Sequence, residues 1–151
     1  MTEQAVATNM APATGASFSA LVAVLGEYFD GLYHSDTSIL RRVFHPGALY
    51  ACPTGGTLLQ LQMDAYFDVV DKRPAPSALG QPRQDRILSI EFAGPVVAIA
   101  RVDCAIAPKR FQDVLTFVFI DGRWQIMSKV FHFEIDEAVS PNGAIAPNQS
   151  R

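Results

Sequence analysis

The stretch Val114–Phe133, VLTFVFIDGRWQIMSKVFHF, holds two runs of strand-forming residues separated by Asp121-Gly122. Asp-Gly favours the two-residue type I′ turn, because both central residues of that turn take positive φ. Strict alternation outward from this turn predicts an antiparallel hairpin with one large, apolar face. The predicted pairs are Phe119 with Trp124, Phe117 with Ile126, Leu115 with Ser128 and Asp113 with Val130.

The chain before this hairpin continues the strand pattern. The segments DRILSIEFAG (85–94) and PVVAIARVDCAI (95–106) contain several β-branched residues and are bounded by Gly, Pro or Asp. With the two hairpin strands they predict four consecutive antiparallel strands. A short turn at 108–109 would bring Cys104 opposite Asp113 on the same face of the sheet.

The first half of the chain has helical spacing instead. Apolar residues recur on one helix face over Leu21–Leu32. A shorter helix follows Asp36, which can act as its N-cap, and should end at His45 because the next residue is proline. The segment ALYAC (48–52) is typical of a strand, and MDAYFDVVDK (63–72) predicts a third helix.

This order predicts an α+β fold in which N-terminal helices pack on one face of a curved antiparallel sheet. We expect the folded domain to span residues 17–133. Residues 1–16 are rich in Ala and Thr and are predicted to be disordered, and residues 134–151 are predicted to form a polar C-terminal tail.

Composition narrows the class of protein. A chain of 151 residues that is 49% hydrophobic can bury the core of one domain. The net charge of −3 gives no electrostatic footprint for nucleic acid, and no apolar run is long enough for a membrane span. Cys52 and Cys104 have neither disulfide-framework nor metal-motif spacing, and the N-terminus lacks the basic start of a signal peptide, so we expect a cytoplasmic protein.

Polar side chains gather at one end of the predicted apolar face. Strict alternation places Asp113, Cys104, Ser128 and His132 there, on the side of the sheet that faces the helices. A carboxylate buried without a partner is costly, so Asp113 is expected either to be hydrogen-bonded or to have a functional role.

The residues of both halves resemble a known family. The segments YFDGLYHSD, LRRVFHPGALY and FQDVLTFVFIDGRWQIMSKVFH resemble the nuclear transport factor 2-like superfamily, within it the putative lumazine-binding (SnoaL-like) branch. The resemblance covers about residues 17–133 and implies a cone-shaped α+β barrel. It leaves the activity open, because the superfamily includes isomerases, dehydratases, polyketide cyclases and domains without catalytic activity.

Two residues are candidates for catalysis. Asp113 could act as a general base, or its carboxylate could be a structural hydrogen-bond acceptor. His132 could be its acid–base partner, or a solvent-exposed residue at the end of a strand. The sequence predicts that the two side chains lie within direct or one-water reach of each other.

Other residues are candidates for binding a ligand in the cone. Arg86 could hold an anionic ligand if its strand keeps the expected register, and His45 could instead bond the last carbonyls of its helix. No His, Cys or acidic residues have metal-ligand spacing, so we expect neither a metal nor a cofactor. The full set is Tyr28, His45, Arg86, Cys104, Leu115, Phe117, Trp124, Ile126 and Ser128.

Three functions fit this pattern. The first is a small-molecule-binding protein whose partly apolar cone holds a flat ligand. The second is an enzyme of the isomerase, dehydratase or cyclase type, in which Asp113 removes a proton next to a carbonyl and His132 or Tyr28 stabilises the oxyanion. The third is a dimeric scaffold domain without catalytic activity.

The outer face of the predicted sheet favours a homodimer. It carries aliphatic and aromatic side chains together with charges, a mixture that suits a two-fold interface. Its residues are predicted to be Ile99, Arg101, Val114, Thr116, Val118, Ile120, Met127, Lys129, Phe131 and Phe133.

Overall fold

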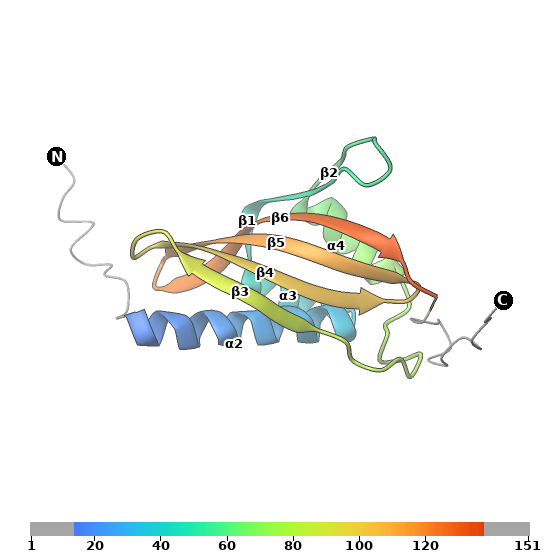
Figure 1. Cartoon of the computed structure of the whole chain (residues 1–151), viewed down its shortest axis with the longest axis horizontal. Helices are drawn as coiled ribbons and strands as arrows, with labels where there is room; N and C mark the ends of the chain where they lie inside the picture. The colour runs from blue at the N-terminus through green and yellow to red at the C-terminus, as the bar shows by residue number, and fades with distance from the viewer. Residues whose placement is uncertain (1–13, 138–151) are drawn as a thin grey trace.

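A computed structural model of the chain describes residues 14–137 (Figure 1). Most of the segment predicted to be disordered and most of the predicted C-terminal tail lie outside the described residues. Residues 14–16, which were assigned to the disordered segment, belong to the first helix. The elements are α2 (Thr14–Tyr33), α3 (Thr37–Val43), β1 (Phe44–Cys52), β2 (Leu59–Gln62), α4 (Met63–Lys72), β3 (Arg86–Phe92), β4 (Val97–Ile106), β5 (Lys109–Ile120) and β6 (Arg123–Ile135).

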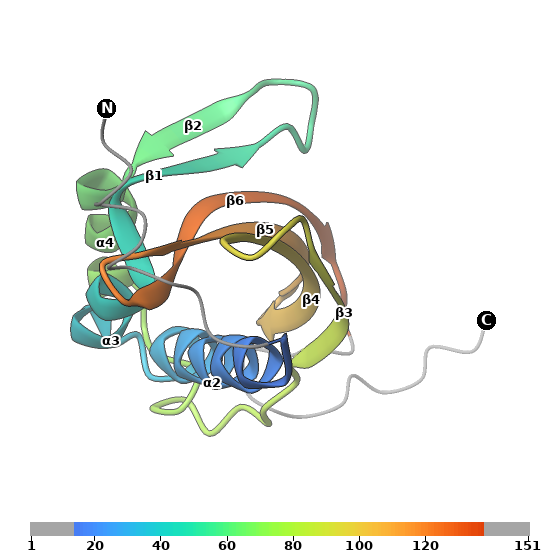
Figure 2. The ribbon, with the colours of Figure 1, turned by 90° about the vertical axis from the view of Figure 1, so that its left-hand side faces the viewer.

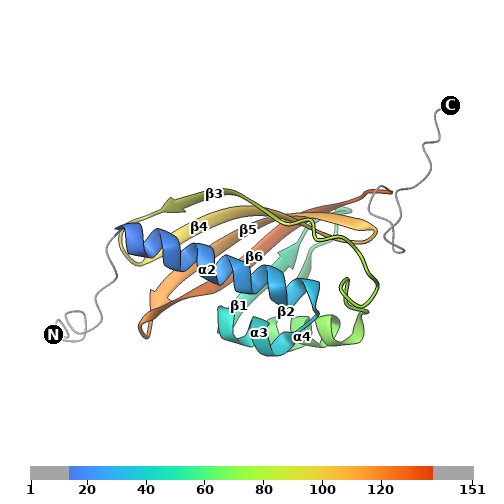
Figure 3. The ribbon, with the colours of Figure 1, turned by 90° about the horizontal axis from the view of Figure 1, so that it is seen from below.

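The six strands form one curved sheet in the order β2-β1-β6-β5-β4-β3. The predicted α+β class is confirmed, and β3 to β6 form the expected antiparallel meander. The sheet as a whole is mixed, because β1 pairs with β6 in parallel. Figure 2 shows the sheet curling round, with α2 lying across its open side. Figure 3 shows α3 and α4 beside each other at one end of α2. Helices and sheet therefore enclose a cone.

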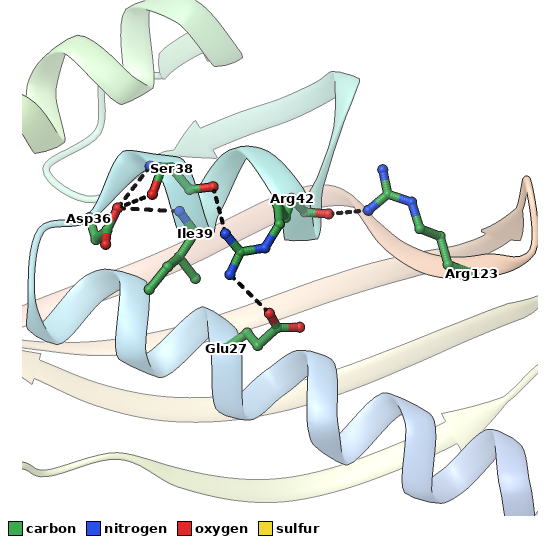
Figure 4. A network of polar contacts seen from close by, with 6 residues as sticks. All are labelled: Glu27, Asp36, Ser38, Ile39, Arg42 and Arg123. Atoms are coloured by element: carbon green, nitrogen blue, oxygen red, sulfur yellow. Dashed lines mark hydrogen bonds and ion pairs between the residues drawn. The ribbon is translucent and has the colours of Figure 1, made fainter.

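The second predicted helix begins where the sequence indicates and ends earlier. Asp36 is its N-cap, and the carboxylate accepts hydrogen bonds from the backbone N–H groups of Ser38 and Ile39 (Figure 4). The helix ends at Val43 instead of His45, since Phe44 already has extended backbone angles. The strand β1 thus starts four residues before the predicted ALYAC segment.

A polar network joins α3 to its neighbours (Figure 4). The guanidinium of Arg42 lies 3.3 Å from the Glu27 carboxylate on α2. Arg123, at the start of β6, donates to the backbone carbonyl of Arg42. These contacts are solvent-exposed and add little stability individually, but they tie α3 to both α2 and the sheet.

The hydrophobic core lies between the helices and the concave face of the sheet. Leu21, Leu25 and Tyr28 of α2 are fully buried against it. From the sheet come Ala100 and Val102 of β4, whose small side chains leave room for the helix. The other large core residues include Leu40, Val43, Phe44, Tyr66, Phe67, Val70, Leu115, Phe117, Trp124 and Ile126.

The hairpin between β5 and β6 has the predicted turn but a different register beyond it. Asp121 and Gly122 both take positive φ, and Phe117 pairs with Ile126 as predicted. The next pair is Thr116 with Ser128, so Met127 is an extra residue in β6. A β-bulge of this kind moves every later side chain of the strand to the opposite face.

The predicted faces of the second half of β6 were therefore wrong. Lys129 pairs with Leu115 and is buried on the side of the helices, where His132 was expected. Ser128 and His132 lie on the outer face. Phe131 and Phe133 are also on the inner face, opposite Asp113 and Phe111, so their predicted place on the outer face was wrong.

A second irregularity corrects the prediction for β3. Ile87 pairs with Val102 and Ser89 with Arg101, so Leu88 is an extra residue. Arg86 pairs with Asp103 on the outer face, and its side chain is 71% exposed. Arg86 was expected to reach the cone only if β3 kept the expected register. Because the register shifts at Leu88, Arg86 points away from the cone.

Candidate functional site

The Asp113 side chain is completely buried between β5 and α2. Its Oδ2 accepts a 2.6 Å hydrogen bond from the Tyr28 hydroxyl. The same oxygen lies 3.9 Å from Lys129 Nζ and 3.8 Å from Cys104 Sγ. Its Oδ1 is buried and has no hydrogen-bond partner among the described residues. Asp113 is thus held through one oxygen, while the other is a buried acceptor without a donor among the described residues.

Lys129 lies inside a cage of aromatic rings. Its ammonium is 3.4 Å from the Tyr66 hydroxyl, and its side chain is only 5% exposed. Five ring centroids lie within 6 Å of Nζ, at the distance of cation–π attraction. They belong to Phe131 (5.2 Å), Tyr28 (5.3 Å), Tyr66 (5.3 Å), Tyr50 (5.7 Å) and Phe111 (5.9 Å).

The proton affinities of this cluster keep Lys129 charged. Burial alone would lower the pKa of Lys129, but the charge of Asp113 and the smaller contributions of Tyr66, Cys104 and Tyr50 together raise that pKa above its ordinary value. Burial, followed by the charge of Asp113, raises the pKa of both Tyr28 and Cys104. At neutral pH the cluster therefore contains an ammonium, a phenol and a thiol around the carboxylate.

The inner cavity is a space of about 120 Å³ beside this cluster. Lys129 and Cys104 reach it from the sheet, and Tyr66 and Val69 reach it from α4. Asp113 does not line it, so Lys129 is the member of the ion pair that faces the cavity. The remaining lining residues are Leu32, Tyr50, Cys52, Leu59, Arg73, Ile106, Lys109, Phe111, Phe131 and Phe133.

The structure brings three of the predicted site residues together. Tyr28, Cys104 and Asp113 meet at the base of the cone, and Tyr28 donates to Asp113 directly. The predicted turn before β5 lies one residue earlier than expected, since Ile106 pairs with Lys109, but Cys104 and Asp113 still share the inner face.

Four other predicted residues lie away from this cluster. His132, on the outer face, is hydrogen-bonded at 2.8 Å to Thr54, so the predicted contact with Asp113 is absent. Ser128 bonds Thr116 there at 2.6 Å. His45 accepts a local hydrogen bond from the backbone of the glycine two residues on, and Arg86 pairs with an outer carboxylate at 2.9 Å.

The four apolar residues predicted to contact a ligand lie in the part of the core that side chains fill completely. Leu115, Phe117 and Ile126 are fully buried, and Trp124 packs edge-to-face against Phe92 and Phe119. None of the four is among the residues that line the inner cavity. Side chains fill this end of the cone, and the open space lies at the other end.

Sequence reasoning missed Lys129, Tyr66 and Arg73. Strict alternation in β6 placed Lys129 outside, although the adjacent apolar residues Ile126 and Met127 already interrupt that alternation. The cost of exposing Phe131 was a second sign of the bulge. Arg73 follows a helix and precedes a proline-rich loop, a position that carries no signal for the direction of its side chain.

The outer face of the sheet carries a shallower depression, the outer groove, of about 270 Å³. Leu88, Val114 and Val130 contribute its apolar surface, and Arg101 and His132 contribute polar groups. Leu88 and Val130 are about two-fifths exposed. This groove is separated from the inner cavity by the sheet.

Residues 14–137 contain neither a metal-binding cluster nor a membrane-spanning helix. No group of three His, Cys, Asp or Glu side chains is arranged to hold a metal ion. No helix in this part of the chain is long and apolar enough to cross a membrane.

Residues 16–132 match the family described as "Putative lumazine-binding". Two solved structures, each described as a nuclear transport factor 2-like (NTF2-like) protein of unknown function, have the same fold. That from Silicibacter pomeroyi DSS-3 is 27% identical with a TM-score of 0.72, covering 82% of this chain and 100% of its own. That from Shewanella baltica OS155 is also 27% identical with a TM-score of 0.72, covering 82% and 98%.

One curated relative has a named activity. "Aldolase FrzH" from Cladobotryum sp is 27% identical over 126 residues, which cover 79% of this chain and 93% of the relative. The family match and the two NTF2-like structures place the chain in the NTF2-like superfamily.

Proposed function

The chain belongs to the family described as "Putative lumazine-binding", and we propose that it is a small-molecule-binding protein whose ligand occupies the inner cavity. One observation carries this proposal: the buried ammonium of Lys129 lines a cavity walled by aromatic rings. An apolar cavity with a few fixed polar groups is the usual form of a ligand site. Asp113 acts as the positioning residue, because it holds the ammonium charged and in place.

A thermal-shift panel with a blocked cavity tests this function. The panel contains pterins, flavin fragments, steroids and aromatic acids, and a bound compound raises the melting temperature. Val69→Trp fills the cavity from a half-exposed position on α4, and Val22→Trp adds the same side chain outside it. We expect at least one compound to stabilise the unmodified protein and Val22→Trp but not Val69→Trp. Equal shifts in all three proteins, or no shift with any compound, would contradict the proposal.

The second candidate function is proton abstraction next to a carbonyl, with Asp113 as the base. It is favoured by the Oδ1 of Asp113, which has no hydrogen-bond partner among the described residues, while Tyr28 fixes the other oxygen. Because Asp113 lies behind Lys129 and does not line the cavity, this function requires Lys129 to move aside when the carbonyl compound binds. Lys129 would stabilise the developing enolate oxygen as a cation. This chemistry is compatible with the name of the aldolase relative. Lys129 would not act as an amine nucleophile, because its raised pKa keeps it protonated.

Deuterium exchange separates this candidate from simple binding. Small ketones such as pyruvate and cyclohexanone are incubated with the protein in D₂O, and exchange of their α-protons is followed by NMR. An enzyme of this kind accelerates exchange, and Asp113→Asn abolishes it while Asp103→Asn, on the outer face, does not. Exchange that survives in Asp113→Asn would exclude Asp113 as the base.

We also propose a homodimer that forms through the outer face of the sheet. Leu88, Val114 and Val130 are each about two-fifths exposed there, beside charges of both signs on Arg101 and Asp103. Such a surface can complement a second copy of itself. Val118→Glu should give a monomer by light scattering, whereas Val22→Glu, on α2 at the other side of the sheet, should not. A monomeric unmodified protein at micromolar concentration would refute the dimer.

We propose a cytoplasmic location as well. Cys52 and Cys104 are both free thiols, which suits a reducing compartment. Fractionation of the source cells tests this proposal, and recovery of the protein outside the cytoplasmic fraction would contradict it.

A further inference from the structure

The inner cavity is lined by more positively charged side chains than nearby acidic side chains neutralise. Arg73, Lys109 and Lys129 line it, and none of the described lining residues is an aspartate or a glutamate. Asp113 lies behind Lys129 and balances that one ammonium. Lys109 lies 4.4 Å from the centroid of the Phe133 ring, a contact that attracts a cation but brings no negative charge. Two cations therefore face the cavity without an anionic partner among the described residues.

Arg73 is the lining cation whose side-chain hydrogen-bond donors lack acceptors in the described part of the chain. It is the residue directly after α4, where its backbone N–H caps the helix by donating to Val70. Its side-chain Nε and Nη2 are both buried, and neither has a hydrogen-bond acceptor among the described residues. Burial of guanidinium donors without acceptors is costly, so a small rotation of the Arg73 side chain that brings this edge to an acceptor in the cavity would be favoured.

The two unpaired donors also specify the shape of the acceptor. Nε and Nη2 of Arg73 form one edge of the planar guanidinium. Two parallel N–H groups on such an edge match the two oxygens of a carboxylate, which accepts both in a bidentate arrangement. A neutral amide offers only one acceptor oxygen to the same edge.

The walls specify the rest of the ligand. Rings from three strands and one helix surround the space, and a volume of about 120 Å³ is close to the roughly 150 Å³ of an engineered protein cavity that binds benzene. A cavity of this size is suited to a single ring. The rings are those of Tyr50, Tyr66, Phe111, Phe131 and Phe133.

We propose that the inner cavity selects a one-ring aromatic carboxylate, with the carboxylate on the Nε–Nη2 edge of Arg73 and the ring against the aromatic wall. This inference rests on the proposed function of the same cavity and adds the class of its ligand. Lys109 and Lys129 strengthen the preference for an anion through their charge. Arg73 is the residue that determines specificity.

Calorimetric titration with matched probes tests the inference. The probes are benzoate, neutral benzamide and cationic benzylamine, which share one ring and differ in charge. They are titrated into the unmodified protein, Arg73→Gln and Lys72→Gln. Lys72 is the exposed last residue of α4, so its change removes the same charge one residue away without entering the cavity. Circular dichroism and melting temperature establish that each variant is folded. A further variant, Arg73→Lys, keeps the positive charge but lacks the two parallel N–H groups of the guanidinium.

We expect benzoate to bind the unmodified protein at least about tenfold more tightly than benzamide, a difference of about 1.4 kcal/mol. Benzylamine should be the weakest probe. Arg73→Gln should remove the preference for benzoate, Arg73→Lys should retain part of it, and Lys72→Gln should retain all of it.

The result that overturns the inference differs from the result that overturns the proposed function. If benzamide binds the unmodified protein as tightly as benzoate, or if Arg73→Gln keeps the preference, Arg73 does not select a carboxylate. In that case loss of both probes in Val69→Trp would still support a ligand site in the cavity. If no probe binds, or if Val69→Trp leaves binding unchanged, both the inference and the cavity's function fail.

Discussion

At the scale of single residues, the buried pairing of Asp113 with Lys129 is costly. Both side chains are at least 95% buried, and removing two charges from water costs several kcal/mol for each. Replacement of such a pair by apolar residues is often neutral or stabilising. The pair is therefore better explained by the cavity that Lys129 faces than by stability.

A double-mutant cycle measures the coupling of this pair. Asp113→Asn leaves the ammonium without its counter-ion, and Lys129→Met leaves the carboxylate without its own, so each should cost roughly 3–5 kcal/mol in urea unfolding. The double variant should lose much less than the sum, because no unpaired charge remains buried. Additive losses would show that the two residues do not interact.

The pair formed by Arg86 and Asp103 is the control. Its arginine is 71% exposed, so Asp103→Asn should change the free energy of unfolding by no more than about 1 kcal/mol. If Asp103→Asn lowered the free energy of unfolding as much as Asp113→Asn does, burial would not be what makes the loss of an ion-pair partner destabilising.

At the scale of elements, the bulge at Met127 determines which side chains of β6 face the helices. The sequence predicted the helix over 63–72, the Asp36 cap and the Asp121-Gly122 turn, because each depends on local chemistry. A bulge depends on packing across the whole sheet and has no local signature. The Tyr28–Cys104–Asp113 cluster was largely predictable, since β5 has no irregularity between its turns and Asp113.

The partners of that cluster were not predictable by alternation. Lys129 and His132 are three residues apart, so a single extra residue between the turn and both of them exchanges their faces. The predicted direction of the Arg86 side chain was wrong for the same reason, because Leu88 is an extra residue in β3. Two features of the sequence favoured the bulged register over the regular one, namely the adjacent apolar residues Ile126 and Met127 and the large apolar side chain of Phe131.

Chemical labelling of the folded protein tests this register. Diethyl pyrocarbonate should modify His132 about as fast as the exposed His34, because the His132 side chain is half exposed. Acetylating reagents should modify Lys72 readily and leave Lys129 unmodified until the protein unfolds, as read by peptide mass spectrometry. Rapid acetylation of Lys129 together with protection of His132 would show that β6 has no bulge.

At the scale of the whole molecule, the cone has one filled end and one open end, with the buried charges between them. The filled end contains Leu115, Phe117 and Ile126, and the open end contains the inner cavity. A core of this design stabilises the fold at one end and leaves the other free to bind a ligand. This arrangement buries several titratable groups. Because their pKa values differ between the folded and unfolded chain, the stability of the fold depends on pH.

That linkage predicts lower stability in alkaline solution. The folded pKa values of Cys104, Tyr28 and Lys129 are raised from ordinary values of 9.0, 10.0 and 10.5. Above each ordinary value the unfolded chain has lost a proton that the folded chain retains, so the free energy of unfolding falls as pH rises. Below pH 9 these three groups contribute a constant stability.

Urea unfolding at pH 7, 9 and 10.5 measures the effect. The unmodified protein should lose stability between pH 9 and 10.5, and Tyr28→Phe should lose less over the same interval because it removes one of the titrating groups. Tyr33→Phe, which removes a hydroxyl that donates to the backbone carbonyl of Gln81 away from this cluster, should follow the unmodified protein. Stability that rises or stays constant above pH 9 would contradict the assigned proton affinities.

The most direct test of the central claim, that the inner cavity is a ligand site, is a crystal structure of the protein grown with saturating benzoate. The account predicts electron density for one benzoate in the inner cavity, with its carboxylate on Nε and Nη2 of Arg73 and its ring beside Tyr66 and Phe131. Benzoate bound only in the outer groove or at the surface, with the inner cavity empty, would contradict it.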